Sequence, residues 1–457
     1  MRLFLYLSIV FSMMATLIGC AEMGTMMGGP GSNSMHYAVT EDGWKIALKR
    51  ISGGSGKPPV ILCHGLSYND RFYSLSPSTS LPAYLAQNGY DVWIVSLRGS
   101  GSSTKWAYKL VQRGMEGYEI YKSTQEGEGT EQLIGAALGG IKLLSELAQD
   151  QLTNVSGNPK YANWVLDDYS FKDVPAVLKY VRNATGQRKV YWVGHSMGGI
   201  VMLCYLIKNS DPDIAGLVTV GSQLTMPPGK IVQTYIEQLQ FLRLMELQGD
   251  SSKIAKAKEI AQATSDDMFY NPYNRDPQIA SMLHSIGSDT PSVGVLGQYL
   301  ELVSSGELKT YNNTFNFSNY ASKITVPYLI MGGGADELAP PQVQQFLYQN
   351  VSSKDKTLDI LGTSNGYSIN YGHNDSLVSM RAAQEVYPRI LNWLDQRTGV
   401  SSGSSTGSVP RSSTYNSSSG YQNPDDQDYG TTRSYRRNRS YRSGEYRDSY
   451  NDRNYGY

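Results

Sequence analysis

Short apolar runs alternate with helical patterns along most of the chain, and this alternation constrains the fold more than any other feature. Apolar runs bounded by turn residues, typical of buried strands, cover residues 59–64, 91–97, 189–195, 216–221 and 326–331, with a weaker run at 358–361. Helical patterns cover residues 81–88, 174–182, 198–208, 342–350 and 380–394. Strands that alternate with helices predict an α/β fold, with a mostly parallel sheet covered by helices on both faces.

The composition supports a globular unit and gives no reason to expect nucleic-acid binding. A chain of 457 residues with 40% hydrophobic and 18% charged residues can bury a core of enzyme size. Lys plus Arg and Asp plus Glu each number 40, so no overall basic field attracts nucleic acid. Cys20, Cys63 and Cys204 are too few for a disulfide framework, and we expect Cys63 and Cys204 to be buried small hydrophobes.

The N-terminus predicts the compartment. Arg2 precedes an apolar run at residues 3–18, which ends at Gly19-Cys20 and resembles a bacterial lipobox. A membrane helix is the alternative, but this run spans about 24 Å at ~1.5 Å per residue, less than the ~30 Å of bilayer hydrocarbon. We therefore predict a lipoprotein signal peptide at residues 1–19 and lipidation of Cys20. The mature protein would then be lipid-anchored to a membrane of the bacterial cell envelope.

Composition also sets the expected domain boundaries. Residues 20–35 are rich in Gly, Met and Ser and predict a tether, after which residues 36–398 form the globular domain. Within the domain, residues 36–51 alternate around a Glu41-Asp42-Gly43 turn signal and predict a β-hairpin.

Two segments are longer than ordinary strand–helix connections and are predicted to be insertions. They are residues 104–166 and 223–325, and the second contains helical spacing at 231–248 and 254–264. Insertions over the carboxyl edge of a sheet commonly form a cap or lid, so we expect at least one of them to cover a substrate and exclude water. Extra helical scaffold is the alternative.

The C-terminal residues 399–457 are rich in Ser, Tyr and Arg and poor in aliphatic residues, which predicts a disordered tail that builds no core. Its Tyr and Arg side chains suit contacts with cell-envelope polymers through cation–π and charge interactions. We nevertheless expect an inert, solvated tail, with polymer contact as the alternative.

The pattern Gly-x-Ser-x-Gly occurs around Ser196, Ser364, Ser401 and Ser405, so context must separate these serines. Only Ser196 follows a predicted buried strand and precedes a predicted helix. Strand, tight turn and helix in this order place a serine hydroxyl at the carboxyl edge of a sheet, in a strained elbow at a helix N-terminus. We therefore predict that Ser196 is a nucleophile.

A serine nucleophile needs a base whose pKa lies near the working pH, which indicates histidine. The chain has five histidines. His36 lies in the predicted hairpin, His64 follows the first buried strand, and His195 lies inside the elbow with its side chain expected to point away from the serine. His284 lies within the second insertion. His373 lies in a loop after the last predicted strand and before the terminal helix, so we predict that His373 is the base.

The imidazole of a catalytic base needs a carboxylate that fixes its tautomer. Asp336 follows the predicted strand at 326–331, where the chain passes from the strand end toward a helix. Asp336 is therefore the candidate acid. Glu337 and Asp375 are the alternatives, and any of these carboxylates could instead cap a helix.

An acyl-transfer site also needs two donors for the oxyanion. The amide of Met197 follows the nucleophile directly, and the second donor is expected from the loop after the first buried strand, for which we choose Leu66. This chemistry requires no metal and no organic cofactor.

Together these residues resemble the α/β-hydrolase superfamily, and several details are similar to the acid lipase group and its bacterial lipoprotein relatives. The details are Val39-Thr40-Glu41-Asp42-Gly43-Trp44, His64-Gly65-Leu66, Leu97-Arg98-Gly99, Tyr169-Ser170-Phe171-Lys172-Asp173-Val174-Pro175-Ala176 and Tyr371-Gly372-His373-Asn374-Asp375. The resemblance covers residues 36–222 and 326–397. It implies the α/β-hydrolase fold and acyl-hydrolase chemistry, and the chain order Ser196, Asp336, His373 matches nucleophile, acid and base in that architecture.

The expected function is hydrolysis of carboxylic esters, with lipid or other acyl esters as substrates, through a Ser-His-Asp triad and an acyl-enzyme. A serine peptidase or amidase on the same scaffold is one alternative. A non-catalytic lipoprotein that binds the cell envelope is another.

Overall fold

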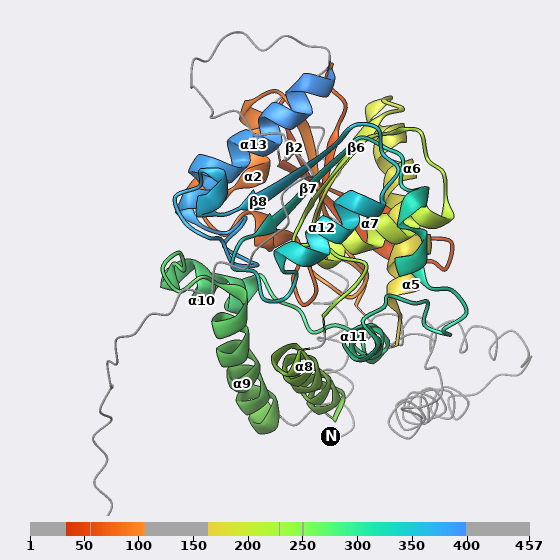
Figure 1. The fold of residues 1–457 in the computed structure, drawn as a ribbon. Coiled ribbons are helices and arrows are strands. Elements are labelled where there is room, and N and C mark those ends of the chain that lie inside the picture. The colour runs from red at the N-terminus through yellow and green to blue at the C-terminus, as the bar shows by residue number, and fades with distance from the viewer. Residues whose placement is uncertain (1–32, 55, 106–162, 228, 249–250, 399–457) are drawn as a thin grey trace, which may run out of the picture. The chain divides into compact units, whose positions relative to one another are not determined.

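A single sheet of eight strands organises the protein (Figure 1). The computed structural model describes residues 33–54, 56–105, 163–227, 229–248 and 251–398. The strands are β1 (Asn33–Val39), β2 (Lys45–Ser52), β3 (Val60–Cys63), β4 (Asp91–Ser96), β5 (Val190–His195), β6 (Ile214–Val220), β7 (Tyr328–Gly333) and β8 (Lys356–Leu361), in the spatial order β1-β2-β4-β3-β5-β6-β7-β8. The β1–β2 and β2–β4 pairs are antiparallel and the remaining pairs are parallel. The predicted mostly parallel sheet is confirmed.

The strands form where the sequence predicts them because their residues are apolar without interruption. Every residue of β3, β4, β5 and β7 is buried, as expected for parallel strands covered on both faces. The predicted hairpin consists of β1 and β2, which pair from Val39 with Lys45 back to Asn33 with Ile51. Since β1 begins at Asn33, the folded chain starts before the boundary that we predicted at residue 36.

Helices cover both faces of the sheet. They are α2 (Leu81–Gln87), α5 (Leu166–Asp168), α6 (Val174–Thr185), α7 (Met197–Lys208), α8 (Lys230–Gln248), α9 (Ser251–Phe269), α10 (Pro277–Ile286), α11 (Val293–Ser305), α12 (Pro341–Asn350) and α13 (Met380–Thr398), with shorter turns η1 (Asp70–Tyr73), η2 (Pro77–Thr79), η3 (Tyr169–Asp173), η4 (Phe317–Lys323) and η5 (Thr363–Asn365). Helices α6, α7 and α12 lie on one face, and α2 and α13 lie on the other (Figure 1).

The covering helices bury one face each, as their sequence spacing predicts. In α13 the buried residues Ala382, Val386, Ile390 and Leu394 recur every four positions and form one stripe. Helix α6 ends where Gly186 takes a positive φ of 66°, a conformation that glycine adopts without steric cost. Local sequence therefore sets both the orientation and the length of these helices.

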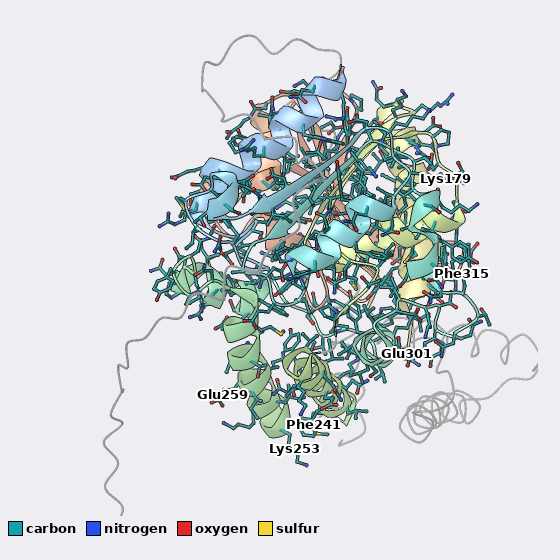
Figure 2. The ribbon with its side chains drawn as sticks, in the orientation of Figure 1. Lys179, Phe241, Lys253, Glu259, Glu301 and Phe315 are labelled. Carbon is teal, nitrogen blue, oxygen red and sulfur yellow. The ribbon has the colours of Figure 1, made fainter. Side chains whose placement is uncertain are left out.

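Residues 223–325, which we call the cap, contribute α8, α9, α10 and α11 beyond the carboxyl ends of the strands (Figure 1), and η4, which packs against α7 and α12. The helices predicted at 231–248 and 254–264 are confirmed as α8 and α9, whereas α10 and α11 were not predicted. Tyr235 and Leu239 of α8 face inward and are buried. Phe241 of α8, with Lys253 and Glu259 of α9, lies on the outer side of the cap (Figure 2).

Several predictions concern residues that the structure does not describe. The signal peptide at 1–19, the lipidation site Cys20, most of the tether at 20–35, most of the insertion at 104–166 and the tail at 399–457 lie outside the described residues. Among the helices that are described, none is both long and apolar enough to cross a bilayer.

Candidate active site

Ser196 occupies a strained elbow between β5 and α7. Its φ of 51° and ψ of −120° are unusual for a residue that is not glycine. The neighbouring glycines make the turn possible: a Cβ on Gly198 would lie 2.0 Å from the Cys63 carbonyl oxygen, and one on Gly194 would lie 2.3 Å from the Gly199 nitrogen. The Ser196 amide donates to the Val220 carbonyl at 2.9 Å. Backbone contact from several strands therefore fixes the serine, as the predicted elbow requires.

His373 and Asp336 form a buried pair at the same edge. The Nδ1 atom of His373 lies 2.7 Å from Oδ2 of Asp336, and both residues are 2% exposed. The other carboxylate oxygen, Oδ1, accepts the amides of Leu338 and Ala339 at 2.9 and 2.8 Å, which fixes the orientation of the carboxylate. Since the carboxylate accepts, Nδ1 carries the proton, and Nε2 is left as an acceptor.

The serine and the histidine–aspartate pair converge around the loop after β6. A Cβ on Gly221 would lie 3.0 Å from Nδ1 of His373 and 3.1 Å from Oδ2 of Asp336. Gly221 follows Val220, the residue that accepts the Ser196 amide. The Ser196 hydroxyl itself forms no hydrogen bond to any described residue. Catalytic hydrogen bonds often shorten only when substrate binds. The sheet edge therefore brings Ser196 and the His373–Asp336 pair together without a hydrogen bond from the serine hydroxyl to His373.

The loop that carries Leu66 passes directly beside the nucleophile. A Cβ on Gly65 would lie 3.1 Å from the Cβ of Ser196, so a larger residue here would crowd the nucleophile. The amide of Met197 is the first of α7 and has no acceptor within the helix. Neither this amide nor that of Leu66 donates to another described residue. Two backbone N–H groups next to the serine are thus available to an oxyanion.

His64 holds this loop in shape. Its Nε2 accepts the amide of Leu97 at 3.1 Å, so the proton is on Nδ1, which lies 2.9 Å from the Gly65 carbonyl oxygen. Burial lowers the pKa of His64, which favours this neutral form.

The rival residues have other partners. His284 lies in the cap, where Nε2 contacts Asp266 at 2.8 Å. Glu337 is exposed, and Asp375 accepts the amides of Gly372 and Asn271 and the side chain of Asn274. The geometry therefore separates Asp336 from both rival carboxylates.

Ser364, another serine in the Gly-x-Ser-x-Gly pattern, is exposed and lies within the short turn η5. Ser401 and Ser405 lie outside the described residues. Of the four serines, Ser196 alone is shown at an elbow.

His195 has a positioning role that the sequence did not reveal. Its Nε2 donates to the backbone carbonyl of His373 at 3.1 Å, a contact that we did not predict. The ring stacks on Phe72 with centroids 4.4 Å apart. Burial, followed by the charge of His373, lowers the pKa of His195 well below its usual value, so the ring is neutral. His195 thereby joins the elbow to the loop of the base.

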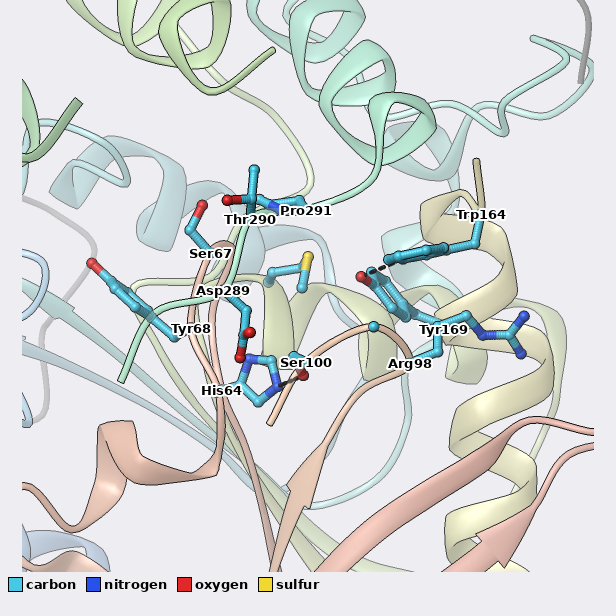
Figure 3. Close-up of a pocket in the computed structure, with 12 residues that line it drawn as sticks. His64, Ser67, Tyr68, Arg98, Ser100, Trp164, Tyr169, Asp289, Thr290 and Pro291 are labelled. Atoms are coloured by element: carbon cyan, nitrogen blue, oxygen red, sulfur yellow. Dashed lines mark hydrogen bonds between the residues drawn. The ribbon is translucent and has the colours of Figure 1, made fainter. Parts of the chain in front are cut away.

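Cap residues cover the site. Ser196 is 6% exposed, and the ring of Phe269, at the end of α9, lies 5.5 Å from that of His373. A small pocket of about 10 Å³ remains beside Met197, bounded by Tyr68, Trp164 and Pro291 (Figure 3). The cap residues 223–325 thus help to enclose the reactive edge, which keeps bulk water away from it.

The chain belongs to the α/β-hydrolase fold family, because the model of that family matches residues 58–360. This range contains Ser196 and Asp336 and ends before His373. The fold class and the family resemblance predicted from the sequence are confirmed.

Several relatives of this chain are named as lipases. Human lipase member K is 23% identical over 402 residues, with 78% of this chain and 86% of the relative covered. Rat gastric triacylglycerol lipase is 23% identical over 415 residues, with 82% and 91% covered. A tear acid lipase-like protein from Mesocricetus auratus is 24% identical over 396 residues, with 76% and 87% covered. The chain is therefore similar to lipases over most of their length.

Solved structures show the same fold. A thermophilic esterase from Thermogutta terrifontis gives a TM-score of 0.50 at 14% identity, covering 80% of this chain and 99% of the esterase. An esterase from Exiguobacterium antarcticum gives a TM-score of 0.50 at 17% identity, covering 79% and 98%.

Proposed function

We propose that the protein hydrolyses carboxylic esters with Ser196 as nucleophile, His373 as general base and Asp336 as the acid that orients the base. The observation that carries this proposal is the buried His373–Asp336 pair, 2.7 Å between Nδ1 and Oδ2, at the same sheet edge as the strained Ser196. The chain order and the roles fit a Ser-His-Asp triad. The names of the lipase and esterase relatives support an ester as the substrate.

The reaction proceeds in two stages. Ser196 Oγ attacks the carbonyl carbon while Nε2 of His373 takes the hydroxyl proton, and the amides of Leu66 and Met197 stabilise the oxyanion. His373 then gives that proton to the departing alcohol, which leaves an acyl group on Ser196. Water attacks the acyl-enzyme as His373 accepts one of its protons, and the return of this proton to Ser196 releases the carboxylic acid. Asp336 stabilises the imidazolium in both stages.

A panel of acyl esters and matched aminoacyl amides tests the proposal, measured on the wild type and on Ser196→Ala. Esters are expected to be turned over faster than amides. Removal of the serine is expected to lower kcat by a factor on the order of 10⁴ to 10⁶, since the remaining groups act only together. Faster turnover of amides would indicate a peptidase or amidase. Absence of any turnover, with envelope binding that depends on residues 399–457, would indicate a binding lipoprotein.

We also propose that Cys20 carries a lipid that anchors the enzyme to a membrane of the bacterial cell envelope, near acyl substrates. The lipobox-like sequence before Cys20 supports this proposal. Metabolic labelling with a fatty acid is expected for the wild type and not for Cys20→Ser. Labelling of the variant would contradict it.

A further inference from the structure

Ser67, next to the oxyanion loop, holds a buried hydroxyl in a strained backbone conformation. Its φ is 66°, a positive value that residues other than glycine rarely adopt, and the residue is 9% exposed. Its Oγ has no hydrogen-bond partner among the described residues. The Asp289 amide of the cap donates to the Ser67 carbonyl at 2.9 Å and holds this conformation. Strain combined with an unpaired buried polar group is typical of a functional position.

A second hydroxyl, that of Tyr235 on α8, lies beside Ser67. Burial raises the pKa of Tyr235, so the phenol keeps its proton and can donate a hydrogen bond. Ser67 comes from a core loop and Tyr235 from the cap. The two hydroxyls therefore meet where the cap closes over the sheet edge.

Ser67 lines two cavities, and Tyr235 lines the larger of them. Ser67 lines the small pocket that reaches Met197, and Figure 3 shows its hydroxyl on the side nearest Thr290, away from His64. Both Ser67 and Tyr235 also line a larger cavity of about 160 Å³ that is partly open to solvent.

The larger cavity is amphipathic. The tyrosine rings and Leu239 supply its apolar wall, and Glu246, Gln262 and Ser265 supply polar groups. Such a wall suits a ligand that carries hydroxyls on a short carbon skeleton better than it suits an alkyl chain without polar groups.

We propose that Ser67 and Tyr235 bind a free hydroxyl on the alcohol part of the substrate, which makes the protein selective for esters of polyols such as glycerol. Ser67 directly follows Leu66, and neighbouring Cα atoms are ~3.8 Å apart. An ester whose carbonyl oxygen meets the Leu66 amide therefore brings the carbon next to its ester oxygen within reach of Ser67. A simple alkyl ester offers these two hydroxyls no partner, and sites built to bind a substrate hydroxyl discriminate against analogues that lack it. This inference rests on the proposed ester hydrolysis.

Glycerol 1-octanoate and n-propyl octanoate test the inference, since they share an acyl chain and their alcohols differ only by hydroxyls. Both are offered in the same detergent micelles to the full-length wild type and to Ser67→Gly, Ser67→Ala and Tyr235→Phe. Glycine adopts a φ of 66° without strain, so Ser67→Gly keeps the loop. For Ser67→Gly we expect kcat/KM to fall about tenfold on the glycerol ester and less than twofold on the propyl ester.

Tyr273→Phe is the matched control for Tyr235→Phe, because Tyr273 lies in the cap and is 86% exposed. It is expected to leave the ratio of the two kcat/KM values unchanged. Equal losses on both esters, or no change on either, in Ser67→Gly would overturn the inference. A wild type that hydrolyses neither ester would instead refute the proposed function, so the two failures are distinguishable.

Discussion

The sheet edge and the cap meet at the active site, and they are built in opposite ways. At the edge, backbone touches backbone: Gly198 lies against Cys63, and Gly194 lies against Gly199. The cap is joined to the core through polar side chains, chiefly Asp289 and Asn274, and through the apolar side chains of its helices. Gly194 and Gly198 of the edge have no room for one additional carbon, and we expect the cap to tolerate the loss of a polar contact better than the edge does. We infer that the edge fixes the reaction and the cap selects what reaches it.

The largest expected effect lies at the edge, in Asp336→Asn. The amide can still accept the Leu338 and Ala339 amides, so the fold remains, but it no longer holds the His373 tautomer or stabilises the imidazolium. We expect kcat to fall by about 10⁴, with an unchanged thermal midpoint, in steady-state kinetics on a soluble ester. A fall in kcat of less than tenfold would contradict the assignment of Asp336 as the acid of the triad.

Two helical glycines, one at the edge and one in the cap, test whether the edge is the more tightly packed of the two regions. A Cβ on Gly198 of α7 would lie 2.0 Å from the Cys63 carbonyl oxygen, whereas a Cβ on Gly297 of α11 would have no neighbour within 4 Å. We expect Gly198→Ala to lower the free energy of unfolding by about 3 kcal/mol or more, and Gly297→Ala to raise it by about 0.5–1 kcal/mol. Urea unfolding measures both. Equal stability of the two variants would refute the close packing at the edge.

The buried neutral His195 makes stability depend on pH. Its pKa lies well below the usual 6.5 in the folded protein, so below pH 6.5 the unfolded chain binds a proton that the folded chain does not. Stability due to this residue is complete above pH 6.5 and falls as the pH decreases toward the folded pKa, by about 1.4 kcal/mol per pH unit. Between pH 7.5 and 5.0, His195→Phe is expected to lose less unfolding free energy than the wild type. Parallel losses in the two proteins would contradict this account.

The smallest effect is expected in the cap, for Asp289→Ala. The Asp289 carboxylate accepts the Gly101 amide at 2.8 Å and the Asn69 side chain at 2.9 Å, and it pairs with Lys105 at 2.7 Å. Its loss should loosen the cap at a cost of about 1 kcal/mol in stability. We expect KM to rise a few-fold while kcat changes less than twofold. A fall in kcat as large as that of Asp336→Asn would abolish the distinction between edge and cap.

The sequence predicted the parts of the molecule that local signals determine. The apolar run before Ser196 and the glycines after it are contiguous, so the elbow between β5 and α7 could be placed without a structure. The sequence alone could not decide which of Asp336, Glu337 and Asp375 orients the base, because all three follow strands or precede helices. Exposure of Glu337 and the contacts of Asp375 with Asn271 and Asn274 depend on packing that no local pattern records.

Long-range contacts account for what the sequence did not predict. His195 bonds to the carbonyl of His373, 178 positions along the chain, and nothing near His195 in the sequence indicates that partner. Helices α10 and α11 were missed for a related reason, since α10 covers only Pro277–Ile286 and both helices bury residues against distant segments. Ser67 carried no local signal either, because serine seldom adopts a positive φ and the residue whose amide donates to its carbonyl, Asp289, is distant in the sequence.

Covalent labelling with a fluorophosphonate probe tests the central claim most directly, because such a probe reacts with a serine activated by a neighbouring base. The account predicts that peptide mass spectrometry of the labelled full-length protein finds the adduct on Ser196, and that His373→Ala abolishes it. An adduct on another serine, or undiminished labelling of Ser196 in His373→Ala, would contradict the assembly of Ser196 and His373 at one edge of the sheet.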